Sequence, residues 1–254
     1  MRRFAAVLLF ACSLAMLAHA GLMTNGIGKA KAAGCNPLTD VAGIKFWLKI
    51  ETLSGTTNGA NVTAWNDSSA NGVNYTGAAN LPTYSTTSGP SGGPAVVFAS
   101  GQFLNSAAQT QTQPFTFFLI TQATLTAITE GVWGTAATTN ISASTSTIPQ
   151  FTINAGSTLA GGTPDGAWHT WAAIYNGASS VLYVDGGAAK ASGAAGSNAF
   201  SSATMTIGKI GGVINYVGNS TDYLLYSGAL TTAQINTVAN CIVALRGMTW
   251  SPAL

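Results

Sequence analysis

Apolar and polar residues alternate over short stretches along most of the chain. IKFWLKI (44–50) places isoleucine, phenylalanine or leucine at every second position, with lysine or tryptophan between them. This period of two predicts a β-strand. Similar runs are VTAW (62–65), VNYT (73–76), PAVVF (94–98), FTFFLITQ (115–122), QFTINA (150–155), WHTWAAIY (168–175), SVLYVD (180–185), TMTIG (204–208) and DYLLYSG (222–228). Clusters of Gly, Asn, Ser and Pro separate them, and many short strands at this spacing predict an all-β sandwich or barrel.

One stretch near the carboxyl end has a helical pattern instead. LTTAQINTVANCIVALRGM (230–248) begins with Thr231 and has Gln234 three residues later, which is the arrangement of a capping box. The apolar residues that recur at helical spacing on one face are Ile235, Val238, Ile242 and Leu245. Cys241 lies beside that face. We therefore expect a terminal helix that packs on the sandwich.

The amino-terminal 34 residues lack such patterns and predict an export signal with a flexible leader. Residues 1–20 have a positive start at Arg2 and Arg3, an apolar run, and small residues at Ala18 and Ala20 around His19, as secretory signal peptides do. An uncleaved anchor is the alternative, although the run is short for a membrane span. Residues 21–34 are glycine-rich and predict the leader. The Thr/Ser/Ala-rich segment 135–148 predicts a long loop.

Composition narrows the possible partners. Only 6% of the residues are charged, against about a quarter in an ordinary soluble protein. Loss of Arg2 and Arg3 with the signal peptide leaves seven basic residues against seven acidic ones. A chain without net charge has little to attract a phosphate backbone or an anionic membrane. We therefore expect no nucleic-acid partner and no membrane insertion after signal cleavage, and a secreted or cell-surface location.

Two cysteines, Cys35 and Cys241, remain after signal cleavage. In an exported protein an even pair favours a disulfide. Two separate buried thiols are the alternative.

The segment DGAWHTWAAIYNGASSVLYVDGG (165–187) predicts a hairpin followed by a second turn. Asn176-Gly177 and Asp185-Gly186 supply residues that tolerate positive φ. The first strand carries His169 beside a tryptophan. A histidine in this setting is usually packed or hydrogen-bonded as part of the fold, so we expect a structural role for it.

This hairpin resembles the strand pair of laminin-G-like jelly-roll domains, a group within the concanavalin A-like lectin/glucanase superfamily. Segments FWLKIETLSG, VTAWNDSSANGVNYT, GPAVVFASGQFL and TIGKIGG…YVGNSTDYLLYSGALTTAQI are similar to other parts of the same domain, in the same order, over about residues 44–245. The resemblance implies a two-sheet antiparallel jelly-roll sandwich with one C-terminal α-helix over residues 35–254. It also implies that the first and closing strands are neighbours, which would bring Cys35 and Cys241 together.

One position departs from the pattern of that group. The closing strands often contain Gly-x-Ile/Leu-x-Glu, whereas this chain has Asp222, Tyr223 and Leu224 there. The fold is unaffected, but an acidic contact cannot be carried over from the group.

Candidate catalytic groups are sparse. Glycosidases need two carboxylates about 5–10 Å apart, and Glu51 and Glu130 each stand alone in the sequence. His169 is the sole candidate base for a Ser–His–Asp set, and no Gly-x-Ser-x-Gly motif is present. We predict that the protein is not an enzyme, with a glycoside hydrolase of the same fold as the less favoured alternative.

A metal or cofactor site has weak support. Asp67 and Asn71 in WNDSSANG (65–72) could contribute oxygens to Ca²⁺, with Asp185 or Asp222 as a further ligand. The favoured alternative is that Asp67 stabilises its own turn by accepting backbone N–H bonds. Cysteine and histidine are too few for a zinc site, and no cofactor is expected.

A sugar-binding site would need aromatic rings and amide side chains. The candidates for the rings are Trp65, Tyr75, Tyr84, Trp133, Tyr216 and Trp250, most of which a sandwich of this size must bury. We predict a secreted, non-catalytic module that binds carbohydrate or a protein surface. The alternative is a structural or adhesive protein of a cell surface or a phage particle.

Overall fold

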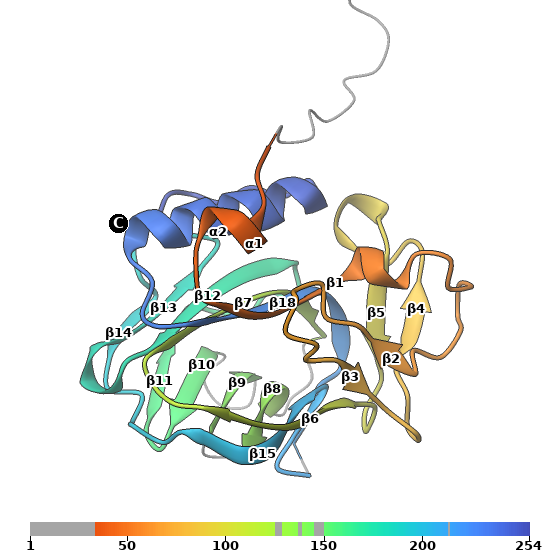
Figure 1. Cartoon of the computed structure of the whole chain (residues 1–254), viewed down its shortest axis with the longest axis horizontal. Coiled ribbons are helices and arrows are strands. Elements are labelled where there is room, and N and C mark those ends of the chain that lie inside the picture. The colour runs from red at the N-terminus through yellow and green to blue at the C-terminus, as the bar shows by residue number, and fades with distance from the viewer. Residues whose placement is uncertain (1–33, 125–128, 137–138, 145–149, 213) are drawn as a thin grey trace, which may run out of the picture.

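The computed structural model describes residues 34–124, 129–136, 139–144, 150–212 and 214–254. These residues form an all-β sandwich of two antiparallel sheets, with helices over the outer face of one sheet (Figure 1). The first sheet has the order β14 (Ala191–Gly193), β13 (Ser180–Val184), β12 (His169–Tyr175), β7 (Phe115–Ala123), β18 (Gly218–Ser227), β5 (Ala95–Phe98) and β4 (Thr83–Ser85), and β1 (Ile44–Lys49) also pairs with β18. We call it the helix-side sheet.

The second sheet closes the other side of the sandwich. Its order is β11 (Thr158–Gly161), β10 (Gln150–Ala155), β9 (Thr139–Ser144), β8 (Thr129–Ala136), β15 (Phe200–Ile207), β6 (Leu104–Gln111), β3 (Tyr75–Thr76) and β2 (Ala64–Trp65). The remaining elements are α1 (Pro37–Asp40), α2 (Thr232–Arg246), the hairpin β16 (Lys209–Ile210) and β17 (Ile214–Asn215), and the 3-10 turns η1 (Ile50–Leu53), η2 (Pro90–Gly92) and η3 (Gly177–Ser179).

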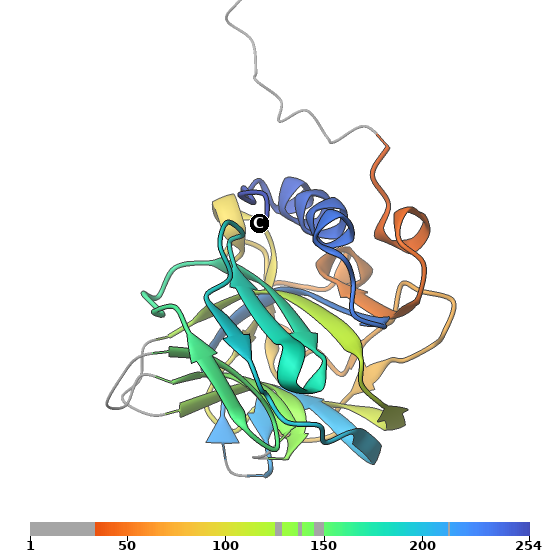
Figure 2. The same ribbon diagram turned by 90° about the vertical axis from the view of Figure 1, so that its left-hand side faces the viewer.

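The helix-side sheet is buried on both faces, which explains its apolar strands. In β7, Phe115, Phe117 and Leu119 pack into the core between the sheets. Phe118 and Ile120, at the alternate positions, pack into a second core beneath α2. Figure 2 shows α1 and α2 together over that outer face. A strand that packs on both sides has no polar face, so its sequence is apolar at almost every position.

Segments from near the two ends of the described chain lie side by side on this outer face, where α1 contacts α2. β1 pairs with β18, so the first and closing strands are neighbours. A disulfide joins Cys35 to Cys241 of α2, with the Cα atoms 5.6 Å apart. The disulfide prediction is therefore confirmed in the structure.

The terminal helix has the predicted ends. The Thr231 side chain accepts a bond from the Gln234 N–H and the Gln234 side chain accepts one from the Thr231 N–H, which completes the capping box. Gly247 ends the helix with φ 63°, a conformation that glycine adopts without strain. Leu245 was expected on the buried face but is 37% exposed, and the buried residues at this end of the helix are Ile242, Val243 and Arg246.

All ten predicted strands are present, although several are shorter or longer than expected. The loop predicted at 135–148 was wrong in part, because residues 135–136 belong to β8 and 139–144 to β9. β8 and β9 pair with each other although this segment is rich in Thr, Ser and Ala, a composition that we took to indicate a loop. The predicted signal peptide, and the leader except for Gly34, lie outside the described residues. Within the described part, no helix is long and apolar enough to cross a membrane.

Candidate functional site: a cleft lined by amide side chains

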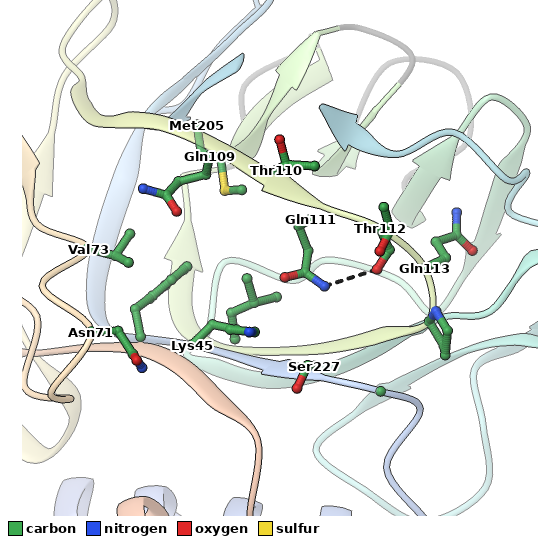
Figure 3. A pocket seen from close by; sticks show the side chains of 14 residues that line it. Lys45, Asn71, Val73, Gln109, Thr110, Gln111, Thr112, Gln113, Met205 and Ser227 are labelled. Atoms are coloured by element: carbon green, nitrogen blue, oxygen red, sulfur yellow. Dashed lines mark hydrogen bonds between the residues drawn. The ribbon is translucent and has the colours of Figure 1, made fainter. Parts of the chain in front are cut away.

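A cleft of about 480 Å³ lies at one end of the sandwich, between β1 and the end of β18 in the helix-side sheet and β6 in the second sheet (Figure 3). One wall comes from β1, the turn before β3 and the end of β18, and carries Lys45, Asn71 and Ser227. The opposite wall is β6 and the segment that follows it, with Gln109, Thr110, Gln111, Thr112 and Gln113. The volume is within the range of small-molecule sites, roughly 300–1,000 Å³.

A β-bulge turns polar side chains toward the cleft on each wall. On β1, Ile44 pairs with Tyr226 and Phe46 with Leu225, so Lys45 between them has no opposite residue on β18. On β6, Asn105 pairs with Thr206 and Ala108 with Thr204, so β6 has one residue more than β15.

The β6 bulge reverses which residues of that strand face inward. Before it, Leu104 and Ser106 are buried, whereas after it Gln109 and Gln111 line the cleft. Bulges re-aim side chains in this way and are over-represented at binding sites.

Several lining groups are fixed by hydrogen bonds. Gln111 Nε2 donates to the Thr112 carbonyl at 3.0 Å (Figure 3). Asn71 Nδ2 donates to the Ile44 carbonyl at 3.0 Å. Gln113 Nε2 donates to the carbonyl oxygens of Gly196 and Asn198. The walls are thus largely formed before any ligand arrives.

Other polar groups are available to a ligand. Lys45 and Gln109 form no side-chain hydrogen bond with another described residue. Figure 3 shows Lys45 and Gln111 extending into the cleft from opposite walls. Side-chain amides both donate and accept hydrogen bonds, as sugar hydroxyl groups do.

The cleft also has an apolar floor and carries no carboxylate. Phe46, Met205 and Leu225 are buried beneath it, and Val73 is half-buried at its side. Among the described residues, no Asp or Glu side chain lines it. The apolar faces of a ligand can therefore pack on the floor, while its polar atoms form hydrogen bonds with the walls.

The aromatic residues selected from the sequence do not contribute to the cleft. Trp65, Tyr75, Trp133 and Tyr216 have no exposed surface, Tyr84 is 7% exposed and Trp250 is 6% exposed. The polar side-chain atoms of all but Tyr84 form hydrogen bonds within the fold, as when Trp133 Nε1 donates to the Tyr75 hydroxyl at 3.0 Å. Most of these rings were expected in the core, but the structure buries all six, five between the sheets and Trp250 beneath α2, so none of them provides a ligand platform.

Asp67 stabilises its turn as expected. Its Oδ1 accepts bonds from the Trp47 and Ser69 N–H groups, both at 2.8 Å. Its Oδ2 accepts from the Ser69 hydroxyl at 2.7 Å and the Val73 N–H at 3.0 Å. These four donors account for the position of the carboxylate. Asp67 and Asn71 together stabilise the turn that forms one wall of the cleft.

Glu51 and Asp222 surround a buried arginine. Arg246 donates to both carboxylates through its Nε, Nη1 and Nη2 atoms, and Trp47 Nε1 donates to Asp222 at 3.1 Å. Burial lowers the Arg246 pKa, but Asp222 and Glu51 outweigh it and the pKa is raised above the ordinary value. The departure noted at Asp222 thus fastens α2 to the helix-side sheet.

His169 lies between two aspartates. Its Nδ1 is 2.6 Å from Asp185 Oδ2 and its Nε2 is 2.9 Å from Asp165 Oδ1. Burial alone would lower the His169 pKa, but the two carboxylates outweigh it and raise that pKa. The imidazole ring also packs on Phe151, with the centroids 5.1 Å apart.

The acidic residues of the described chain do not converge on a metal-binding group. No three His, Cys, Asp or Glu side chains of the described residues come together as metal ligands. Glu130 is fully buried in β8, away from the cleft lining.

The cleft residues were missed because no strand was predicted over β6 (Leu104–Gln111). A period of two from Leu104 would direct even-numbered residues inward, and the bulge changes this. The sequence signal that could have indicated the site is the repeated glutamine at 109, 111 and 113 beside a strand end.

Comparisons with known proteins support the fold. No protein-family model matches the sequence, and no curated protein is similar to it. Domain 4 of AbnA, a GH43 extracellular arabinanase from Geobacillus stearothermophilus solved with arabinotriose, is similar in structure, with a TM-score of 0.56 and 17% identity, over 78% of this chain and 98% of that one.

Two other solved structures are larger than this chain. Trypanosoma rangeli sialidase matches with a TM-score of 0.56 and 15% identity over 80% of this chain and 34% of that one. An arabinofuranosidase complexed with arabinofuranosyl-α-1,2-xylobiose matches with a TM-score of 0.55 and 17% identity over 73% of this chain and 51% of that one. This chain thus spans about a third and a half of their lengths. At these identities the likeness establishes the β-sandwich fold.

Proposed function

We propose that the protein is an exported, non-catalytic, laminin-G-like carbohydrate-binding module whose glycan site is the cleft between β1 and β6. The observation that carries the proposal is the pair of bulges that aim Lys45, Gln109 and Gln111 into one cleft from opposite walls. Carbohydrates present hydroxyl groups around an apolar carbon ring. The cleft has matching amides on its walls and apolar side chains on its floor.

The charges of the cleft favour a neutral or anionic glycan. Of the described residues that line the cleft, Lys45 alone is charged, and it donates hydrogen bonds without accepting them. Without a carboxylate, the cleft lacks the pair of acids that glycoside hydrolysis uses. Elsewhere, Asp165 and Asp185 bind His169, and Glu51 and Asp222 bind Arg246. These contacts support a binding role rather than hydrolysis.

Three further findings support the proposal. Domain 4 of AbnA was solved with arabinotriose and is similar to this chain over nearly its whole length. The disulfide is typical of proteins that reside in an oxidising compartment, in agreement with export. The pairing of the first and closing strands and the C-terminal helix support the laminin-G-like interpretation.

A glycan array followed by titration calorimetry tests the proposal. We expect the protein to bind one class of glycan on the array. Lys45→Ala and Gln109→Ala should each weaken that binding about threefold to tenfold, since a hydrogen bond contributes roughly 0.5–1.5 kcal/mol. Gln150→Ala, a glutamine on β10 outside the cleft, is the matched control and should bind like the wild type. Absence of binding to every glycan, together with self-association, would contradict the proposal and favour a structural role.

A further inference from the structure

A second hollow lies at the other end of the sandwich, around Trp168. Its volume is about 400 Å³ and its lining includes Trp168, Asp185, Ser91, Met248, Thr249 and Ser251. Four separate chain segments meet there: the start of β12, the turn after β13, η2 and the tail after α2. We call it the Trp168 hollow.

Trp168 differs from every other tryptophan of the chain. The other five are at most 6% exposed, whereas Trp168 is half-buried, packs on one side against the core beneath α2, and lines the hollow. Its indole nitrogen forms no hydrogen bond with another described residue. The buried Trp171 Nε1 also has no partner, but the half-buried Trp168 ring lines the hollow, where it can offer a ligand both an apolar face and a hydrogen-bond donor.

Asp185 supplies acceptors beside this ring. Its side chain is 42% exposed. Its Oδ1 accepts from the Thr170 N–H at 2.8 Å and its Oδ2 contacts His169 Nδ1 at 2.6 Å. Each oxygen keeps a further lone pair for a ligand. Thr249 and Ser251 also line the hollow.

The walls include left-handed backbone and are joined by backbone hydrogen bonds. Asp185 and Ser91 both have φ of 56°, and they are two of the three non-glycine residues with positive φ in the described chain. Asp185 is held by backbone bonds between its carbonyl and the Ser251 N–H, and Gly187 donates to the Ser251 carbonyl. A Cβ on Gly186 would lie 1.7 Å from the Ser251 carbonyl oxygen. Strained residues of this kind cluster at binding sites.

We propose that the Trp168 hollow is a second carbohydrate site, in which a neutral pyranose ring stacks on Trp168 and its hydroxyl groups donate hydrogen bonds to Asp185. An aromatic face with a few fixed polar groups is the usual form of a specific small-ligand site. A cationic ligand fits less well, because His169 already faces the Asp185 carboxylate.

The hollow is separate from the cleft between β1 and β6. In the β12–β7 pair, Tyr175 lies opposite Phe115 and His169 lies opposite Thr121. The cleft reaches Pro114 at the first end of β7, and Trp168 precedes His169 at the other. Six residue steps along a strand span roughly 20 Å. Two sites at this separation would allow one polysaccharide, or two chains, to be bound with increased avidity.

Quenching of tryptophan fluorescence by acrylamide tests this proposal, because Trp168 is the accessible tryptophan. The measurement uses the Lys45→Ala/Gln109→Ala protein, in which the cleft is disabled, and the probes cellohexaose, xylohexaose, mannohexaose and choline. We expect at least one hexasaccharide to reduce the quenching constant about twofold or more. In the absence of sugar, Trp168→Phe should remove most of the quenching, which checks that Trp168 is the tryptophan that acrylamide reaches.

Calorimetry with the protecting hexasaccharide then assigns the site. Trp168→Ala should weaken binding at least about tenfold, which corresponds to about 1.4 kcal/mol. Thr249→Tyr, which fills the hollow from its exposed rim, should do the same without removing a core contact. Circular dichroism checks the fold of both variants. Protection by no hexasaccharide, protection by choline alone, or unchanged affinity in the folded Thr249→Tyr protein would overturn the proposal. None of these outcomes bears on the cleft, which is tested with Trp168 intact.

Discussion

The imidazole Nδ1 of His169 lies 2.6 Å from Oδ2 of Asp185, across the hairpin that joins β12 to β13. The same carboxylate accepts the Thr170 N–H through its other oxygen. The histidine therefore orients the aspartate at the end of the strand pair, while Asp165 holds its Nε2 from the preceding turn. This supports the structural role that we expected for His169, and it gives the fold a dependence on pH.

Because the His169 pKa is raised in the folded protein, the protonated ring stabilises the fold. This stabilisation is complete at pH values below about 6.5, the pKa of histidine in the unfolded chain. It is lost as the pH rises through the higher pKa of His169 in the folded protein. We expect the free energy of unfolding of the wild type to fall over that interval, and that of His169→Gln to stay flatter. Denaturant unfolding from pH 5 to pH 9 measures both curves. If the free energies of unfolding of the two proteins changed in parallel with pH, His169 would not be the group that causes the dependence. Glycan binding at the cleft should be unchanged in His169→Gln.

Arg246→Met should be strongly destabilising. It leaves Asp222, which has no exposed surface, without its cation. Loss of one partner of a buried ion pair costs about 3–5 kcal/mol. Lys190→Met, at an exposed lysine, is the matched control and should change the free energy of unfolding by less than about 0.5 kcal/mol. Equal stability of the two variants in urea would show that the Arg246 network contributes little.

The Cys35–Cys241 disulfide should be formed in the exported protein and should stabilise it. The cysteines are 206 residues apart in sequence, and the loss of chain entropy for such a ring gives an upper figure of about 5 kcal/mol. Cys35→Ala/Cys241→Ala should therefore melt at a clearly lower temperature than the oxidised wild type. Mass spectrometry of the unreduced protein checks the bond directly. Two free thiols after oxidative export would contradict the prediction.

Asp67→Ala should destabilise the protein by about 2–3 kcal/mol, because three backbone N–H groups lose their acceptor. Asp40→Ala, at an exposed residue near the start of the described chain, is the control and should have a small effect. Addition of a chelator should leave the melting temperature of the wild type unchanged, since the same donors explain the turn without an ion. A drop of several degrees that Ca²⁺ restores would show that Asp67 and Asn71 hold a metal.

Much of the fold could be predicted because local patterns agree with it. The apolar run of β7 and the capping box of Thr231 each depend on neighbours in sequence, and both are present in the structure. The hairpin pairs Trp171 with Val184, which brings Thr170 opposite Asp185. Had this register been derived from the sequence, it would also have predicted that His169 and Asp185 are neighbours.

The sites were harder to predict because they depend on bulges and on which faces are covered. The extra residue on β6 moves Gln109 and Gln111 into the cleft, and no sequence pattern marks its place. Both faces of the helix-side sheet are buried, so alternation could not separate the buried Trp171 from the accessible Trp168. The contacts of Arg246 with Asp222 and Glu51 join residues 24 and 195 positions apart, beyond any local pattern.

The central claim is that the cleft between β1 and β6 is the glycan site, and a nuclear magnetic resonance titration tests it most directly. The tightest glycan from the array is added to ¹⁵N-labelled protein, and the backbone and side-chain amide shifts are followed. Our account predicts that the side-chain amides of Gln109 and Gln111 and the backbone amide of Lys45 shift together, with one dissociation constant that Gln109→Ala raises. Saturable binding that leaves all three signals unmoved would contradict it.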